Sequence, residues 1–204
     1  MLSVRQLSRF VLVLVCAAWA VVASAQILNS ERIEQTFGSY GIEVLYSDAK
    51  IRLANLYSVH DGRRITRTLA IVRYPDEVNE AFAKEHAAIL EGGSIGATFQ
   101  AAGWQVIKDY HQYFRSFLSP RLVDLMDVAP GTPMASHAYQ LEIAKGDERF
   151  DYALIVEIYH PDYLSESDLV DIYGPEEVIG MPDDVRTLLE TGRALLEKTL
   201  ALRQ

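Results

Sequence analysis

The sequence predicts an α+β fold in which helices pack on an antiparallel sheet. Two observations predict it. Segments with the alternating pattern of strands outnumber the segments with a helical pattern. The strand segments also follow one another mostly across short turns, which is typical of hairpins and therefore of antiparallel pairing.

The first hairpins lie in the N-terminal half. Residues 42–59 are typical of a strand, a polar turn and a second strand, and Asp61-Gly62 then gives a strong turn signal. The next strand, residues 64–75, alternates with period two and is closed by Pro75. Its two faces would carry Ile65, Arg67, Leu69, Ile71 and Arg73 on one side and Thr66, Thr68, Ala70, Val72 and Tyr74 on the other.

Helical patterns dominate the middle of the chain. Residues 76–93 have an apolar stripe at helical spacing and end at two glycines, which stop a helix. Ser94 is placed to cap a short helix over residues 95–103, and residues 104–114 read as a strand. Pro120, tolerated in a first turn, opens another short helix.

A last hairpin and a terminal helix complete the prediction. Residues 134–144 and 150–159 alternate like strands on either side of the polar loop 145–148. The segment 161–182 is acidic and reads as a loop, whereas 183–203 carries a leucine-rich stripe and is expected to be a helix.

The first 25 residues match a secretory signal peptide that is cleaved after Ala25. Arg5 and Arg9 precede an apolar run, and small residues occupy the cleavage site. The alternative is an N-terminal membrane anchor, but the run is short for a spanning helix, which needs about 20 apolar residues. We therefore expect a periplasmic or secreted protein without stable membrane insertion after cleavage.

Composition limits the remaining chain to one domain, residues 26–204, held by its core alone. The only cysteine, Cys16, lies in the leader, so no disulfide and no thiol chemistry are expected in the mature protein. The full chain carries a formal charge of −9, and losing two arginines with the leader leaves −11. Such a charge argues against nucleic acid or anionic membrane as the main partner.

Glu157 is the strongest candidate for a site, because it sits in a strand that is apolar on both faces. Burying a carboxylate is costly unless it is paired or hydrogen-bonded. If the strands share a sheet, Arg67 and Arg73 would line one cavity with Glu157 and hold an acidic or polar small molecule. A glutamate in apolar surroundings could also serve as a general acid. The alternative is that Glu157 and one arginine form a buried structural pair, or that their strand faces are partly solvated.

Other chemistry is less well supported. The five histidines form no pair with metal-ligand spacing, and only His137 and His160, with Asp162, could meet across a hairpin. We therefore expect no metal, and the sequence indicates no cofactor. Ser94 lacks the context of a nucleophile and suits a helix cap, although the neighbouring glycines could bring backbone N–H groups near an anion.

The order of these pieces resembles the chorismate lyase fold and the similar UTRA ligand-sensing domain of GntR-type transcription regulators. The resemblance covers residues 42–164, leaving 165–204 as an acidic loop and C-terminal helix. It rests on the hairpin ending at Pro75, on the Leu-Met-Asp-Val-Ala-Pro-Gly-Thr-Pro segment 125–133, and on a last hairpin ending Tyr-His-Pro-Asp-Tyr-Leu at 159–164.

The resemblance implies a sheet of about six strands with a small-ligand cavity between sheet and helices. It also implies a glutamate on the last strand, matched by Glu157, that protonates the departing substrate in lyases. Arginines on earlier strands hold carboxylates there. Here Arg67 and Arg73 are displaced from those positions, and Arg52 lies too far before the Asp61-Gly62 turn.

Three functions follow as hypotheses. The first is an exported, non-enzymatic protein that binds a small molecule through Arg67, Arg73, Glu157, Tyr159 and Ser94. The second is a lyase-type enzyme on the same scaffold with Glu157 as general acid. The third is a protein-interaction module that uses the acidic segment and the C-terminal helix.

Overall fold

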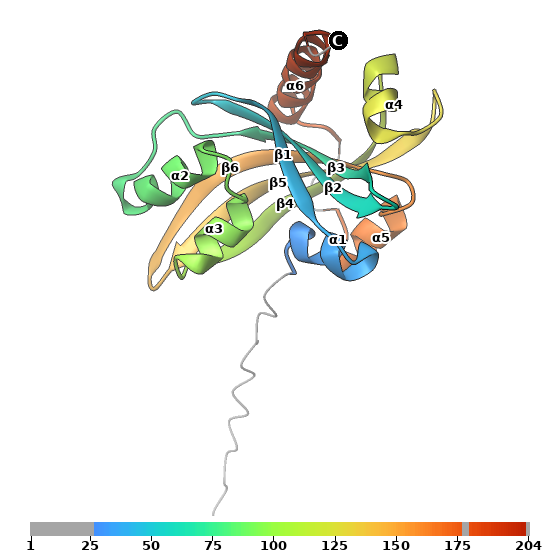
Figure 1. Cartoon of the computed structure of the whole chain (residues 1–204). Coiled ribbons are helices and arrows are strands. Elements are labelled where there is room, and N and C mark those ends of the chain that lie inside the picture. Colours follow the sequence, from blue (N-terminus) through green and yellow to red (C-terminus); the bar gives the residue numbers. More distant parts are fainter. Residues whose placement is uncertain (1–26, 177–179, 203–204) are drawn as a thin grey trace, which may run out of the picture.

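The computed structural model describes residues 27–176 and 180–202, so the expected signal peptide lies outside the described residues (Figure 1). The elements in chain order are α1 (Asn29–Phe37), β1 (Gly41–Ser47), β2 (Ile51–His60), β3 (Arg63–Arg73), the 3-10 helix η1 (Glu80–Phe82), α2 (Ala83–Leu90), α3 (Ile95–Ala101), β4 (Gln105–Phe117), α4 (Pro120–Met126), β5 (Pro133–Lys145), β6 (Glu148–Tyr159), α5 (Glu166–Tyr173) and α6 (Asp183–Ala201). None of these helices is both long and apolar enough to cross a membrane.

The strands form one six-stranded sheet in the order β1-β2-β3-β6-β5-β4. Every neighbouring pair is antiparallel, which confirms the predicted fold class. Sequential strands pair within each half of the sheet, across turns except for β4 and β5, which are joined through α4. The two halves join where β3 pairs with β6, and Ala70 lies opposite Glu157 at that junction.

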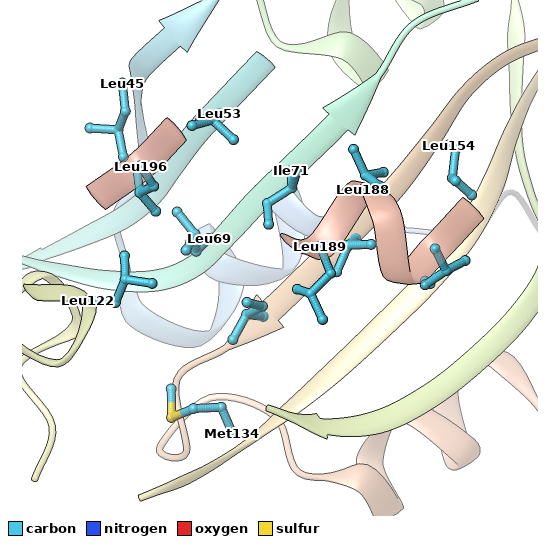
Figure 2. Close-up of a cluster of buried hydrophobic side chains, with 14 of the residues drawn as sticks. Leu45, Leu53, Leu69, Ile71, Leu122, Met134, Leu154, Leu188, Leu189 and Leu196 are labelled. Carbon is cyan, nitrogen blue, oxygen red and sulfur yellow. The ribbon is translucent and has the colours of Figure 1, made fainter. Parts of the chain in front are cut away.

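One face of the sheet is covered by α6 and α4 (Figure 1). Leucines of α6 pack against aliphatic side chains of β3 and β6, as the labelled residues of Figure 2 show. Gly192 lets α6 approach closely, because a Cβ at this position would lie 2.4 Å from the Ile71 Cγ2 atom. This face forms a continuous apolar core.

The opposite face carries two separate clusters. Toward one end, η1, α2 and α3 pack Phe82, Ile89 and Phe99 against the sheet. Toward the other end, α1 and α5 pack Ile33 and Leu169 against it. Glu157 lies on this face, between the two clusters, where the helices leave the sheet partly uncovered.

The structure corrects three local expectations. Residues 76–93 are helical only from Glu80 onward, through η1 and α2. The segment 161–182 is not a continuous loop, because it contains α5, whose Ser165 and Asp168 form a capping box. Ser94 occupies the N-cap position of α3, but its side chain makes no cap hydrogen bond. The division into a signal peptide and one domain stays a prediction.

Candidate functional site

A cavity of about 90 Å³ opens between the two clusters, on the face of the sheet that carries Glu157. One water needs roughly 10–15 Å³ measured this way, so the cavity has room for about six to nine water-sized groups. Its walls are mostly apolar, and its polar lining comes from few side chains. The polar side chains are Asn29, Ser30, Tyr40, Arg52, Ser94, Lys108, Tyr139 and Glu157.

Glu157 is buried, and its carboxylate is held from three sides. Tyr159, two residues along β6, donates its hydroxyl to Oε2 at 2.6 Å. Asn29 at the start of α1 donates to Oε1 at 2.9 Å. Lys108 of β4 places its ammonium 3.4 Å from Oε2, with side chains of both partners below a tenth exposed. These contacts satisfy the charged form of the carboxylate.

Lys108 is the ion-pair partner of Glu157. Its ammonium also lies 3.3 Å from the Tyr173 hydroxyl and 4.3 Å from the centre of the Tyr139 ring. Burial alone would lower the pKa of Lys108, but Glu157 and the two tyrosines outweigh burial and hold the pKa well above its ordinary value. Lys108 is therefore a charged group of the cavity wall.

Arg52 of β2 is the second buried cation of the wall, with 1% of its surface exposed. Its Nη1 donates to the carbonyl oxygens of Ile89 and Gly93 at 2.7 and 2.8 Å, at the C-terminal end of α2. A cation is favoured at this end of a helix. Within the described part of the chain, Nη2 makes no hydrogen bond of good geometry, and no carboxylate forms an ion pair with Arg52. The Tyr74 hydroxyl lies near Arg52: burial raises its pKa, and Arg52 lowers it.

Tyr40 and Ser94 lie beside Arg52. Burial raises the pKa of Tyr40, the Ser94 side chain and Arg52 lower it, and Glu157 raises it. The Tyr40 hydroxyl is buried and makes no hydrogen bond to the described residues within bonding geometry. Arg52 Nη2 and the Tyr40 hydroxyl are thus two buried donors without a hydrogen bond among the described residues, and both residues line the cavity.

The cavity carries a local positive charge within an acidic protein. Arg52 and Lys108 contribute two cations to its lining, whereas Glu157 contributes one carboxylate. A buried charge without a counter-ion is unfavourable. The pairing of Lys108 with Glu157 leaves the charge of Arg52 as the uncompensated one.

Arg67 and Arg73 do not join Glu157, contrary to the sequence interpretation. Because Ala70 lies opposite Glu157, Ala70 and not Ile71 shares its face. Arg73 therefore points to the α6 face, where it is half-buried and its Nη2 lies 3.5 Å from Asp184 Oδ2.

The register between β2 and β3 passes from Leu56↔Thr68 to Tyr57↔Thr66, so Arg67 is an extra residue in β3. This bulge places Arg67 on the same face as Glu157, but farther along the strand. There Arg67 stacks 3.6 Å from the centre of the Phe37 ring and donates from Nε to Ser58 at 2.9 Å. It lines a different hollow, together with Phe37 and His160.

Of the other candidate residues, Ser94 and Tyr159 lie at or next to the cavity, and the histidines do not form a site. Ser94 lines the cavity, and Tyr159 contacts Glu157 without lining the cavity itself. His137 lies against His111, whereas His160 lies 3.8 Å from Asp162, so the two histidines do not form a shared site. Across residues 27–176 and 180–202, no three potential metal ligands gather.

Sequence reasoning missed Arg52, Lys108, Tyr40 and Asn29. For Lys108 a signal existed, because it stands alone at an inward position between apolar residues of an alternating strand. For Arg52 the only signal was its place between Ile51 and Leu53 in a strand segment, and its burial is seen only in the structure. Asn29 had no comparable signal, since its role depends on where α1 docks.

Fold and site define an antiparallel α+β domain with a charged cavity on one face of its sheet. Solved structures of regulators described as GntR-family are similar to 62% of the chain. One similar structure is described as the ligand-binding domain of a GntR-family transcriptional regulator from Bordetella bronchiseptica (12% identity, 88% of that chain covered, TM-score 0.42).

Two further structures resemble the same share of the chain, 62% in each case. They are a GntR-family transcriptional regulator from Enterococcus faecalis (10% identity, 93% of that chain covered, TM-score 0.34) and the C-terminal domain of the histidine utilization repressor from Pseudomonas syringae (9% identity, 89% covered, TM-score 0.32). No family model matches the chain, and no curated protein matches it.

Proposed function

We propose that this protein is an exported, non-enzymatic binding protein that holds a small anionic molecule in the cavity beside Glu157. One observation carries the proposal: Arg52 is buried in the cavity wall with an unused Nη2 donor and no carboxylate partner among the described residues. An anionic ligand would supply the missing partner, and the planar guanidinium suits a carboxylate in particular.

The cavity also limits the rest of the ligand. Its volume of about 90 Å³ suits a small molecule, and aliphatic side chains form most of the wall. Small-molecule sites commonly combine an apolar lining with a few oriented polar groups. We therefore infer a ligand with one carboxylate or similar anionic group, placed near Arg52 and Tyr40, and a short apolar body.

A binding role is favoured over the lyase role because of the state of Glu157. A general acid must carry a proton before it acts. In the structure Glu157 accepts hydrogen bonds from Tyr159 and Asn29 and faces the Lys108 ammonium, all of which favour the carboxylate.

The test compares acids with amides of the same shape. Thermal shift and calorimetric titration would use hexanoate and benzoate against hexanamide and benzamide. We expect the acids to raise Tm and the amides to have little effect. Arg52→Met should weaken acid binding by tenfold or more, corresponding to about 1.4 kcal/mol or more.

Arg73→Met provides the matched control, because Arg73 lies on the opposite face of the sheet and pairs with Asp184. It should leave acid binding unchanged. Equal binding of acids and amides, unchanged binding by Arg52→Met, or no binding of either acid would contradict the proposal.

Export is a separate part of the proposal, supported by the basic start, apolar run and small-residue cleavage site of residues 1–25. Fractionation of cells followed by N-terminal sequencing would test it. We expect a product outside the cytoplasm that begins at Gln26; an intact N-terminus in the cytoplasm would contradict it.

A further inference from the structure

A second hollow, of about 390 Å³, lies near the start of β3 and shares no lining residue with the cavity beside Glu157. Its lining comes from the first half of β3 and from residues at or just after the ends of α1, β2, α4 and β6. The proposed function uses none of these residues. The charges that they place around the hollow show what it could hold.

Arg67 is a buried cation of this hollow and has no counter-ion. Only 6% of its surface is exposed, and it lines the hollow. Its Nε donates to Ser58 and its guanidinium stacks on Phe37, but its two Nη groups make no hydrogen bond and no ion pair with the described residues. Burial lowers the pKa of Arg67, and the opposing effect of Asp162 is smaller. A buried charge of this kind is unfavourable unless a partner is supplied.

Asp162 brings the opposite charge to the hollow, and no cation neutralises it. Its backbone N–H donates to His160 Nδ1 at 3.1 Å, so this nitrogen carries no proton. The same nitrogen lies 3.8 Å from the Asp162 carboxylate and therefore cannot donate to it. Burial and Arg67 lower the pKa of His160 by more than Asp162 and Asp127 raise it, which favours the neutral ring. No lysine or arginine of the described chain forms an ion pair with Asp162.

The other charged side chain of the lining already has a partner. Asp127 Oδ2 lies 3.4 Å from Arg63 Nη2. Phe37 and Ile65 add apolar surface to the same lining. The hollow thus combines one unpaired cation, one unpaired carboxylate and an apolar wall. The two aspartates disfavour a simple anion there, and Arg67 disfavours a simple cation.

We propose that this hollow binds a free α-amino acid with an apolar side chain. The carboxylate of the amino acid meets the Nη groups of Arg67, because the planar guanidinium suits a carboxylate. Its ammonium meets Asp162, and its side chain lies against Ile65 and Phe37. An α-amino acid carries both charges on one carbon, so a single molecule supplies both missing partners.

The cavity beside Glu157 does not suit the same ligand. Glu157 already accepts from Asn29 and Tyr159 and is paired with Lys108, so it leaves no free carboxylate for an ammonium. The lining of that cavity also carries two cations, Arg52 and Lys108, which repel an ammonium. The two sites are therefore expected to select different ligands.

Calorimetric titration of the full mature chain with L-leucine and L-phenylalanine tests the proposal. N-acetyl-L-leucine lacks the ammonium, and L-leucinamide lacks the carboxylate. We expect leucine to bind and each derivative to bind about tenfold more weakly or worse, since each loses hydrogen bonds to a charged group. Equal binding of leucine and either derivative would overturn the proposal. So would the absence of binding by both amino acids at millimolar concentration.

Two variants locate the site. Arg67→Met removes a charge that has no counter-ion, so leucine binding should fall about tenfold or more while Tm is unchanged or higher. Asp162→Asn keeps the shape of a side chain that is 78% exposed and should weaken leucine binding about threefold or more. Arg64→Met is the matched control. Arg64 lies in the same strand and also stacks on a ring, 4.7 Å from the centre of Tyr57, but it does not line the hollow.

Leucine binding should be unchanged in Arg64→Met, and binding that persists in Arg67→Met would overturn the proposal. If Arg67→Met lowers Tm sharply, Asp162→Asn decides, and an unchanged leucine affinity in that variant overturns the proposal. Loss of leucine binding in Arg52→Met with full binding in Arg67→Met would place the amino acid beside Glu157 and overturn it as well. The binding of hexanoate, which tests the other cavity, has no bearing on these outcomes.

Discussion

Glu157 and Lys108 are buried together, and neither charge has another strong partner of opposite sign in the described cavity wall. Removing one member leaves the other charge buried and unpaired, which typically costs about 3–5 kcal/mol. We therefore expect Glu157→Gln and Lys108→Met each to lower the free energy of unfolding by about 3–5 kcal/mol. Denaturant unfolding of both variants measures this.

The double variant is the control for that prediction. Replacing both members of a buried ion pair is often close to neutral. Glu157→Gln combined with Lys108→Met should therefore be more stable than either single variant. Additive losses in the double-mutant cycle would show that the two side chains stabilise the fold independently and that the ion pair is not the cause.

Asn29 makes a sharper probe of the charge on Glu157. Its amide donates to Glu157 at 2.9 Å and accepts from the Tyr163 hydroxyl at 2.7 Å. Asn29→Asp keeps the shape and the Tyr163 contact but faces one carboxylate with another. We expect a loss of about 1.5–3 kcal/mol at neutral pH, the range for a hydrogen bond to a charged group.

The pH dependence of Asn29→Asp tests the cause of the loss. Repulsion raises the folded-state pKa of the new carboxyl above its unfolded value. The penalty is therefore complete above that folded pKa, declines as pH falls through it, and disappears below the unfolded pKa. A stability difference from wild type that is constant between neutral and acidic pH would indicate a steric cause, and Asn29→Ala provides an uncharged comparison.

The burial of Glu157 was predictable and its cationic partner Lys108 was not, for a physical reason. An isolated carboxylate in an apolar strand is visible in the sequence. Which cation meets it depends on the pairing of β3 with β6 and on two bulges, which shift side chains from one face to the other. Arg67 and Arg73 were chosen from strand alternation alone, which shows neither the register between β3 and β6 nor the positions of the bulges.

At the scale of elements, the contact between α6 and β3 depends on one glycine. Glycine inside a helix usually costs about 1 kcal/mol relative to alanine, so a free site would gain from the change. At Gly192, however, the new Cβ would lie 2.4 Å from Ile71 Cγ2. We expect Gly192→Ala to destabilise the protein by about 1–3 kcal/mol, as is typical of overpacking.

Thermal unfolding of Gly192→Ala measures the loss, and Thr191→Ala is the matched control. Thr191 lies in the same helix but is exposed, so alanine should be neutral or slightly stabilising there. A gain in Tm for Gly192→Ala would mean that α6 lies farther from the sheet than described.

The elements themselves were predicted where local signals are strong. The Asp61-Gly62 turn and the polar loop 145–148 fixed two hairpins that the structure contains. The helix α5 was missed because it spans only eight residues, three of them acidic, which is short for a helical pattern to be recognised. Its capping box, Ser165 with Asp168, was the available signal.

For the whole molecule, the sequence predicted the antiparallel α+β class because hairpins constrain their own pairing. The cavity is a property of a larger scale, since α1, α3 and all six strands each contribute part of the wall. Its positive charge also contrasts with the net charge of −9 for the chain. Composition describes the exposed surface, and it gives no information about a few buried cations.

Buried ionisable groups also set the pH range in which the molecule is stable. Burial lowers the pKa of His86, His137 and His160 from the ordinary 6.5. On acidification the histidines of the unfolded chain therefore bind protons at a higher pH than those of the folded protein. The stability that the neutral buried histidines contribute is complete above pH 6.5 and is lost as pH falls through their folded-state pKa values. Each proton bound by the unfolded state alone steepens the loss by about 1.4 kcal/mol per pH unit.

The alkaline limit has the opposite sign. Burial raises the pKa of Tyr139 and Tyr159 well above 10.0, and Glu157 helps to raise that of Lys108 above 10.5 despite its burial. Because these folded-state values exceed the unfolded ones, their contribution is complete below about pH 10 and is lost as pH rises further. Urea unfolding across pH should thus show a plateau from about pH 7 to 9.5 with losses on both sides.

The acid side of the stability curve shows whether histidines or carboxylates cause the loss of stability at low pH. Carboxylates alone would begin to destabilise the protein only near their ordinary pKa values of about 4. Histidine protonation in the unfolded chain moves the onset of the loss to just below pH 6.5, the ordinary pKa of histidine, because the three buried rings have lowered pKa values in the folded protein. His86→Gln removes one of these rings, whose Nδ1 lies 2.9 Å from the Tyr152 hydroxyl. Its slope near pH 5.5 should fall by up to about 1.4 kcal/mol per pH unit, and an unchanged slope with onset near pH 4 would assign acid unfolding to carboxylates.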